Sequence, residues 1–199
     1  MKTNELRTEE NRNRSVIYYI EPRESISPYD KYFKSAADEI GWDWRLIVAI
    51  AWHESRFDTT VISSRGAGGI MQMMPRTALR FGLETEEDIR NPEKSIRAGA
   101  KYLAWLQRLF KDIEDEYERN KFILAAYNAG QGHVLDAIAL TEKYGGNTQK
   151  WRDVEVYFLK KNDPMYFNDP VCKSGRYRAN HAVGYVRKVY KTYREYYKI

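Results

Sequence analysis

Helix-start and helix-stop signals recur along the chain from about residue 27 onward, and few segments show the alternation of a β-strand. Ser27-Pro28 has the form of an N-cap followed by a first helical position, and Gly41 ends that segment. The pattern predicts further helices at 43–57, 75–82, 92–110, 115–129, 132–144, 151–161 and from about 181. Residues 1–26 lack periodicity. The chain is therefore expected to form a mainly α domain at residues 27–199, preceded by a linker or N-terminal tail.

Composition excludes several kinds of protein. The chain has 199 residues, 43% of them hydrophobic, which suits one domain with its own core. Its single cysteine, Cys172, excludes an internal disulfide. His53, His133 and His181 do not have the spacing of metal ligands, so we expect no metal site and no cofactor.

Charge is concentrated at the C-terminal end. Residues 173–199 hold eight basic side chains and one acidic side chain, a net +7, whereas the whole chain carries +5. Such a tract is either a solvated helix face or a surface that attracts an anionic polymer. It matches no recognised nucleic-acid module, so nucleic acid is not an expected partner. The sequence also has no apolar run of about 18 residues and no signal peptide between Met1 and Ser15.

The helix predicted at 43–57 places an acid next to its apolar face. Glu54 follows Ile50 by four residues and Ile47 by seven, near the end of the helix. A carboxyl there is partly removed from water, which raises its pKa and keeps it protonated near neutral pH. Trp52 and Phe57 are expected to supply the apolar wall around it.

The segment after this helix, residues 58–74, reads as a loop or short hairpin. Gly66, Gly68 and Gly69 permit tight backbone paths and the close approach of a ligand. A protonated acid beside such a loop suits the cleavage of a glycosidic bond.

Most glycosidases use two carboxyl groups, but only one is expected at this site. The nearest other acid, Asp58, would point away if the helix ended before it. The acidic run at 84–88 has the pattern of a solvated surface. A site with one carboxyl must take its nucleophile from the substrate.

Four elements, in this order and at this approximate spacing, resemble the lytic transglycosylases, which are lysozyme-like enzymes that cut peptidoglycan. They are Glu54-Ser55, the stretch 66–75, Tyr127-Asn128-x-Gly130 and the stretch 185–189. The stretches 27–30, 42–46 and 169–171 are most similar to the catalytic domain of the membrane-bound lytic murein transglycosylase F family. The resemblance implies an α+β lysozyme-like fold that is mainly helical, with the glycine-rich loop or hairpin by the active site.

The resemblance also implies an activity. Members of the family cleave the β-1,4 bond between N-acetylmuramic acid and N-acetylglucosamine without water. The C6 hydroxyl of the muramic acid ring attacks, which leaves a 1,6-anhydro end. A hydrolytic muramidase of the goose-lysozyme kind, a non-catalytic peptidoglycan-binding module and a scaffold for other wall enzymes are the alternatives. A second carboxyl group placed to activate water would favour the muramidase.

Residue roles follow from the matching motifs. The resemblance assigns the acid and base to Glu54, and a hydrogen bond near it, or a helix cap, to Ser55. Ser63 would border the groove. Met71 and Gln72 would line it on either side of the scissile bond, with Met71 packed on a sugar face and Gln72 bonded to an acetamido or hydroxyl group.

The later motifs complete the expected site. Tyr127 would pack beneath the catalytic turn, Asn128 would hold the acetamido group or the surroundings of Glu54, and Tyr185 would donate a hydrogen bond toward the catalytic carboxylate. Met73 and Met74 are expected in the core. His53 is expected at the rim, and His133 and His181 at helix starts without chemistry.

The expected partner is the peptidoglycan glycan strand, bound by a monomer. The parent protein is expected in the periplasm or at the outer membrane. Its export signal and any membrane association would come from regions absent from this chain. Relatives in the resembled family carry a solute-binding-protein-like domain ahead of the catalytic one.

Overall fold

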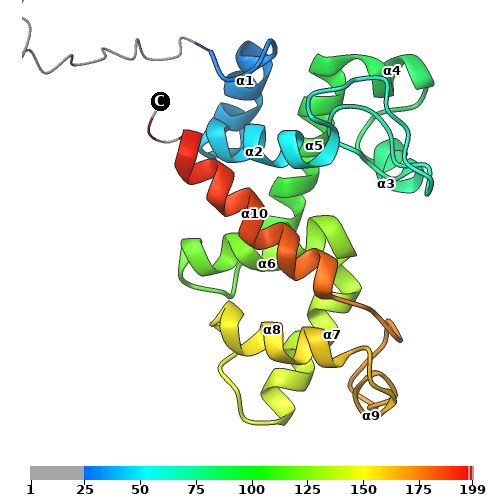
Figure 1. Ribbon diagram of the computed structural model, residues 1–199, viewed down its shortest axis with the longest axis vertical. Coiled ribbons are helices and arrows are strands. Elements are labelled where there is room, and N and C mark those ends of the chain that lie inside the picture. Colours follow the sequence, from blue (N-terminus) through cyan, green and yellow to red (C-terminus); the bar gives the residue numbers. More distant parts are fainter. Residues whose placement is uncertain (1–24, 197, 199) are drawn as a thin grey trace, which may run out of the picture.

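The computed structural model describes residues 25–196 and 198, so most of the expected tail at residues 1–26 lies outside the described residues. The described part is mainly helical (Figure 1). Its helices are α1 (Asp30–Ile40), α2 (Trp44–Ser55), α3 (Pro75–Arg80), α4 (Glu86–Arg90), α5 (Pro92–Leu109), α6 (Glu116–Ala129), α7 (Gln131–Lys143), α8 (Trp151–Lys160), α9 (Pro164–Phe167) and α10 (Asn180–Tyr196). No helix of this part combines the length and the apolar character needed to cross a membrane.

Each helix expected from the sequence is present, and most ends differ by one or two residues. The start of α1 differs for a local reason. The carboxylate of Asp30 accepts hydrogen bonds from the backbone amides of Ile26 and Ser27, both at 2.8 Å. Residues 26–29 therefore form a turn, and α1 begins at Asp30 instead of Pro28. Its end is at Gly41 as predicted, in a left-handed conformation with φ of 69°.

Two short helices lie where the sequence pattern predicted none. The acidic run at 84–88 includes a capping box, in which Thr85 and Asp88 bond each other's backbone amides, and α4 begins there. The segment 162–180, expected to be irregular, contains α9, which starts after the capping carboxylate of Asp163. Both helices depend on local caps and have no apolar periodicity of their own.

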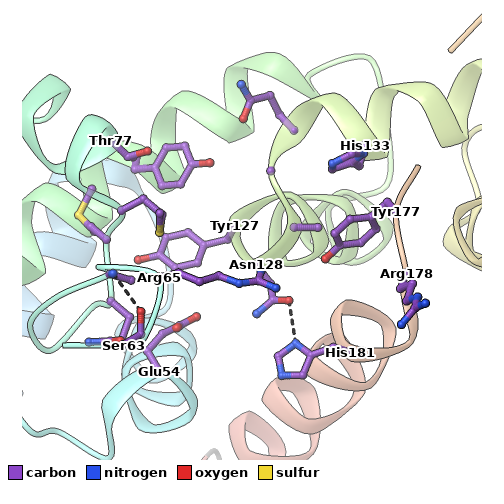
Figure 2. A pocket seen from close by; sticks show the side chains of 18 of the residues that line it. Glu54, Ser63, Arg65, Thr77, Tyr127, Asn128, His133, Tyr177, Arg178 and His181 are labelled. Carbon is purple, nitrogen blue, oxygen red and sulfur yellow. Dashed lines mark hydrogen bonds between the residues drawn. The ribbon is translucent and has the colours of Figure 1, made fainter. Parts of the chain in front are cut away.

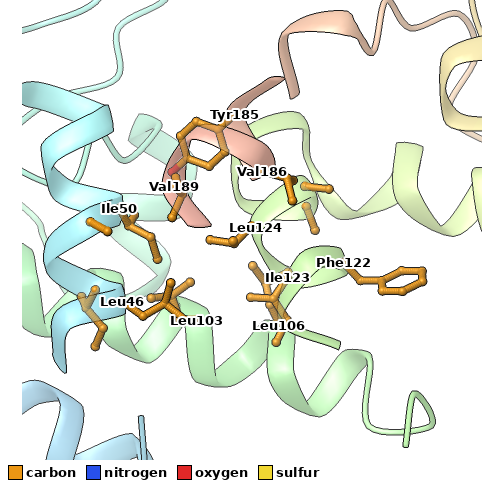
Figure 3. Packing of buried hydrophobic residues seen from close by; sticks show 14 of the residues in the cluster. Leu46, Ile50, Leu103, Leu106, Phe122, Ile123, Leu124, Tyr185, Val186 and Val189 are labelled. Carbon is orange, nitrogen blue, oxygen red and sulfur yellow. The ribbon is translucent and has the colours of Figure 1, made fainter. Parts of the chain in front are cut away.

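The core lies where α2, α5, α6 and α10 meet. Figure 1 shows α10 crossing α6 and reaching α2, and it packs against both helices. Figure 3 shows the buried side chains that these helices contribute: Leu46, Ile50, Leu103, Leu106, Phe122, Ile123, Leu124, Tyr185, Val186 and Val189. Each fully buried aliphatic side chain stabilises the fold by about 1.5–3 kcal/mol relative to its exposed state.

Helix α2 is buried around its whole circumference in the middle. Residues 46–51 are all buried, including Val48 and Ala49, which lie off the face predicted from the periodicity. The reason is that α1 and α10 both pack against α2. This burial fixes the position and direction of the C-terminal end of α2, where Glu54 lies.

Candidate active site

A cleft of about 980 Å³ opens beside the end of α2. One wall is the glycine-rich loop, residues 56–74. Side chains from α5 and the end of α6 lie along it, and the opposite wall is the segment 173–178, which we call the strap. Figure 2 shows Glu54, Tyr127 and Asn128 close to one another in this cleft, with Tyr177 and Arg178 on the strap side.

Glu54 is a proton donor held by a neutral partner. The hydroxyl of Tyr185 donates a 2.6 Å hydrogen bond to Oε1 of Glu54. Burial raises the pKa of Glu54 to about 7, and the bond from Tyr185 only partly offsets this effect. The carboxyl therefore retains its proton at near-neutral pH, as the helix position predicted. The predicted hydrogen bond from Tyr185 is confirmed.

Glu54 is the only carboxylic acid among the described residues that line the cleft. Asp58 lies beyond the end of α2, where its Oδ1 accepts hydrogen bonds from the backbone amide and the hydroxyl of Thr60, both at 2.7 Å. These bonds lower its pKa. Asp58 is exposed and turned to its own loop, so the expectation of a single acid is confirmed for this part of the chain.

The glycine-rich loop is closed by sparse antiparallel pairing. Isolated bridges join Ile62 to Gly68 and Gly68 to Met73, so the loop has a hairpin-like form without extended strands. Gly69 has a φ of +71°, and a Cβ atom there would lie 2.2 Å from the carbonyl oxygen of Ile89. Only glycine permits this approach of the loop to the end of α4.

Two side chains fasten this loop to the helices around it. The hydroxyl of Ser55 donates a 2.9 Å hydrogen bond to the carbonyl oxygen of Ile70. The hydroxyl of Tyr127 donates a 2.8 Å bond to the carbonyl oxygen of Met71. Tyr127 therefore lies beneath the loop, as expected, and Ser55 joins α2 to the loop instead of lining the cleft.

The methionines differ from the prediction. Met71 is fully buried and packs against Gly99 of α5, so its expected place in the groove is wrong. Met73 and Met74 line the cleft instead. Met73 is largely buried as predicted, but Met74 is 45% exposed and is not a core residue. Between Met71 and Met73, Gln72 adopts a left-handed conformation with φ of 46°.

Gln72 and Ser63 line the cleft as predicted, and both also hold the loop. Nε2 of Gln72 donates to the carbonyl oxygens of Val61 and Gly69, at 3.0 and 2.9 Å. These bonds occupy the amide donors, which leaves the acceptor Oε1 as the group for a ligand. The hydroxyl of Ser63 accepts a 3.0 Å hydrogen bond from the backbone amide of Ala67.

The apolar wall predicted from Trp52 and Phe57 is elsewhere. These two rings pack against each other with centroids 5.4 Å apart, and neither lines the cleft. The rings near Glu54 come from Tyr127 and Tyr185, on α6 and α10. Both are distant in sequence, so no pattern around residue 54 could identify them. His53 bonds Thr192 of α10 at 2.8 Å and is not a partner of Glu54.

Asn128 lines the cleft as predicted, and two histidines expected to have no part in the site lie beside it. Nδ1 of His181 is hydrogen-bonded to Oδ1 of Asn128 at 3.2 Å (Figure 2). His133 stacks on Tyr177, with ring centroids 4.4 Å apart. Both histidines line the cleft, as does Tyr102 of α5. Helix periodicity gave no signal for these positions, because each faces the cleft only once distant helices have packed.

The basic tract of the sequence divides between two surfaces. Arg176 and Arg178 lie on the strap and line the cleft, and Arg65 faces the same cleft from the glycine-rich loop. Arg187 instead pairs with Glu155 on the outside of α8. The excess of charge at residues 173–199 indicated this feature, but only the fold shows which arginines face the site.

Comparisons with known proteins are consistent with this geometry. A family model described as the transglycosylase SLT domain matches residues 31–150. Membrane-bound lytic murein transglycosylase F from Alcanivorax borkumensis is 36% identical over 180 residues, which cover 90% of this chain and 37% of that protein. The protein of the same name from Haemophilus influenzae is 38% identical over 83% of this chain and 33% of its own length. The chain thus spans about a third of these relatives.

The solved structures give the same result for the fold. The 70-kDa soluble lytic transglycosylase from Escherichia coli superposes with a TM-score of 0.54 and 25% identity. The match covers 85% of this chain and 24% of that protein. The expectation of a mainly helical, lysozyme-like domain is confirmed.

Proposed function

The chain belongs to the transglycosylase SLT domain family, and on this premise we propose that it is a lytic transglycosylase that cleaves the glycan strands of peptidoglycan. The observation that carries the proposal is Glu54, a single carboxyl with a pKa of about 7 in a cleft large enough for several sugar rings. A group with that pKa is available both to give and to take a proton near neutral pH.

The reaction proceeds in two proton transfers through the same carboxyl. Protonated Glu54 first gives its proton to the glycosidic oxygen, and the bond from C1 of the N-acetylmuramic acid ring to that oxygen breaks. The 2-acetamido group assists at C1. The Glu54 carboxylate then takes the proton of the C6 hydroxyl as O6 bonds to C1. No water is consumed, and the product ends in a 1,6-anhydro ring.

The surroundings of Glu54 suit this sequence of steps. The hydroxyl of Tyr185 holds Oε1 in both protonation states and stabilises the carboxylate that forms after the first transfer. Asn128, held by His181, offers its amide to the acetamido group. Tyr127 fixes the position of the glycine-rich loop, which lines the cleft, by donating a hydrogen bond to the carbonyl oxygen of Met71.

The alternatives have less support. A muramidase that activates water with a second carboxylate needs an acid opposite Glu54, and the described part of the cleft wall offers none. A module that only binds glycan has no use for an acid with a raised pKa.

Muropeptides released from purified peptidoglycan test the proposal directly. The unmodified chain should release products that are lighter by one water than their reducing-end counterparts, and Glu54→Gln should release none. The alkaline limb of the pH–rate profile should lie near pH 7, where Glu54 loses its proton. Reducing-end products from the unmodified chain would show hydrolysis and refute the proposal.

The wider setting is proposed from the relatives. Those named above are membrane-bound enzymes, so we propose that this protein acts in the periplasm or at the outer membrane. The catalytic unit would be a monomer formed by residues 27–199. Analytical ultracentrifugation of the purified chain, and fractionation of cells that produce it, would test these two points.

A further inference from the structure

The cleft carries a marked excess of positive charge. Among the described residues that line it, Arg65, Arg176 and Arg178 are cationic, and the one acid, Glu54, keeps its proton up to a pH of about 7. The arginines come from opposite walls. A charged group of the substrate would meet cations on both sides.

The strap that carries two of these arginines is anchored by a buried ion pair. Asp136 of α7 is paired with Lys161, whose side chain is fully buried. The same carboxylate accepts hydrogen bonds from the backbone amides of Lys173 and Ser174, at 2.9 and 2.8 Å. The first residues of the strap are thereby held to α7.

The rest of the strap is held by Tyr177 and Arg176. The backbone amide of Tyr177 donates to the carbonyl oxygen of Lys161 at 3.1 Å, and its ring stacks between His133 and Phe158. Nε of Arg176 donates to Asn162 at 3.0 Å. The backbone of the strap is thus fixed on α7 and α8, while Arg176 and Arg178 are exposed residues that line the cleft.

Close packing of the strap on α7 depends on a glycine. A Cβ atom on Gly132 would lie 2.4 Å from the hydroxyl oxygen of Ser174. The strap is therefore seated against the helix, and its arginines have a defined place along the cleft wall.

The remaining part of the cleft has a different character. Met74, Thr77 and Tyr102 line it, with no charged group among them, and Tyr102 is part of an aromatic cluster with Phe81 and Trp105. Thioether and aromatic surfaces suit the faces of neutral sugar rings. Arginine forks suit carboxylates, which they bind in pairs of parallel hydrogen bonds.

We propose that Arg176 and Arg178, with Arg65 opposite them, bind carboxylates of the peptide stem that hangs from the glycan, and so select strands with acidic stems. The inference rests on the proposed function. The sugar rings and their acetamido groups are neutral, so the stem is the part of the substrate that brings several negative charges to one side of the strand. The fixed strap holds the arginines at a set distance from Glu54, so a bound stem would also place the scissile bond.

A chemical change of the substrate, combined with a change of the enzyme, tests this pairing. The substrates are purified peptidoglycan and the same material with its carboxylates converted to amides. The enzymes are the unmodified chain, the double variant Arg176→Gln with Arg178→Gln, and the control Arg108→Gln. Arg108 is exposed on α5 and does not line the cleft.

Amidation should raise the KM of the unmodified chain roughly tenfold, the effect of losing two exposed charge pairs. The double variant should show the same rise on untreated material and little further rise after amidation, while kcat changes less. Arg108→Gln should behave as the unmodified chain. The proposal would be overturned if amidation left the KM of the unmodified chain unchanged. It would also be overturned if the double variant, relative to the unmodified chain, lost as much activity on amidated peptidoglycan as on untreated peptidoglycan.

A third substrate separates the stem from the lactyl group of the sugar. Strands stripped of stems by an amidase retain only the lactyl carboxylate. They should be as poor as amidated peptidoglycan, and equal turnover of stripped and intact strands would overturn the proposal.

Co-sedimentation of Glu54→Gln with untreated and amidated peptidoglycan gives a binding readout that does not depend on turnover. If no substrate yields 1,6-anhydro products but binding still depends on carboxylates and on the strap arginines, the proposed function is refuted. The proposed carboxylate-binding site is then still supported. If anhydro products form without any dependence on the arginines, only the inference fails.

Discussion

Two carboxyl groups, one in the cleft and one that holds the strap from α7, have pKa values shifted in opposite directions. Glu54 at the end of α2 has its pKa raised to about 7 by burial, and its hydrogen-bond partner is the neutral hydroxyl of Tyr185. Burial alone would also raise the pKa of Asp136, but the bonds from Lys161 and from two backbone amides lower it overall.

The difference shows that burial does not decide the role of a carboxyl in this fold. A buried acid with a neutral partner retains a proton and can donate it, whereas a buried acid with a cation and two amides stays ionised and holds structure. The first lies in the cleft. The second fixes the wall opposite.

Removing the anion of the second site should have the largest effect on stability. Asp136→Ala leaves Lys161 buried without its partner, which should lower the free energy of unfolding by about 3–5 kcal/mol. Urea unfolding at pH 7 measures this loss. Glu39→Ala is the control, because Glu39 and Arg97 form an exposed pair that contributes no more than about 1 kcal/mol. A similar, small loss for both variants would show that the buried pair does not anchor this region.

Removing the carboxyl of Glu54 should instead raise the free energy of unfolding at alkaline pH. The folded chain holds the Glu54 proton to higher pH than the unfolded chain, so stability falls as pH rises from about 4.5 to about 7. Glu54→Gln removes that fall. The variant should be more stable than the unmodified chain by about 3 kcal/mol at pH 8 and equal to it at pH 4.

Urea unfolding at the two pH values measures this gain, with the exposed Glu142→Gln as the control. If Glu54→Gln and the unmodified chain were equally stable at pH 8, ionising Glu54 would cost little free energy. Burial would then not raise its pKa as described above.

The neutral partner of Glu54 can be removed without changing its burial. Tyr185→Phe deletes the hydrogen bond that lowers the pKa of Glu54, so the alkaline limb of the pH–rate profile should move upward. The rate near neutral pH should fall roughly tenfold, since the carboxylate loses a bond worth about 1.5 kcal/mol. Tyr190→Phe on the same helix, whose hydroxyl bonds the carbonyl of Tyr117, is the control. If the rate fell but the alkaline limb of the pH–rate profile stayed in place, Tyr185 would contribute only through packing.

The smallest effect is expected where α7 meets the strap. Gly132→Ala places a Cβ atom against the hydroxyl of Ser174, which should cost about 1 kcal/mol and raise KM with little change in kcat. Adding Ser174→Ala removes the obstructing oxygen and should restore KM. Failure of this second change to restore binding would mean that the strap does not sit on Gly132 in the working enzyme.

Local patterns predicted much of the fold and the identity of the acid. Helix ends such as Gly41 and the first residue of α5 depend on side chains within a few positions, which the sequence displays directly. Glu54 was recognisable because its place relative to Ile50 follows from the helical repeat. The short helix α4 was missed because its capping box lies in an acidic run that resembles a solvated surface.

Predictions about which side chains face the cleft were less accurate. Met71 was expected in the groove and lies in the core, where it packs against Gly99 of α5. Its direction depends on this contact with a helix that is distant in the chain. Trp52 and Phe57 were expected around Glu54 and instead pack on each other. Their direction depends on how α2 is covered by its neighbours.

The longer helices, the glycine-rich loop and the acid were predictable from the sequence alone, since each depends on contacts between residues close in the chain. Only the folded chain supplies the partners that hold these carboxyl groups, the Tyr185 hydroxyl for Glu54 and the strap amides for Asp136. Tyr185 is 131 positions from Glu54, and the amides of Lys173 and Ser174 are 37 and 38 positions from Asp136. Burial and the charge of a partner set a pKa, and both are created only when segments that are distant in the chain come into contact.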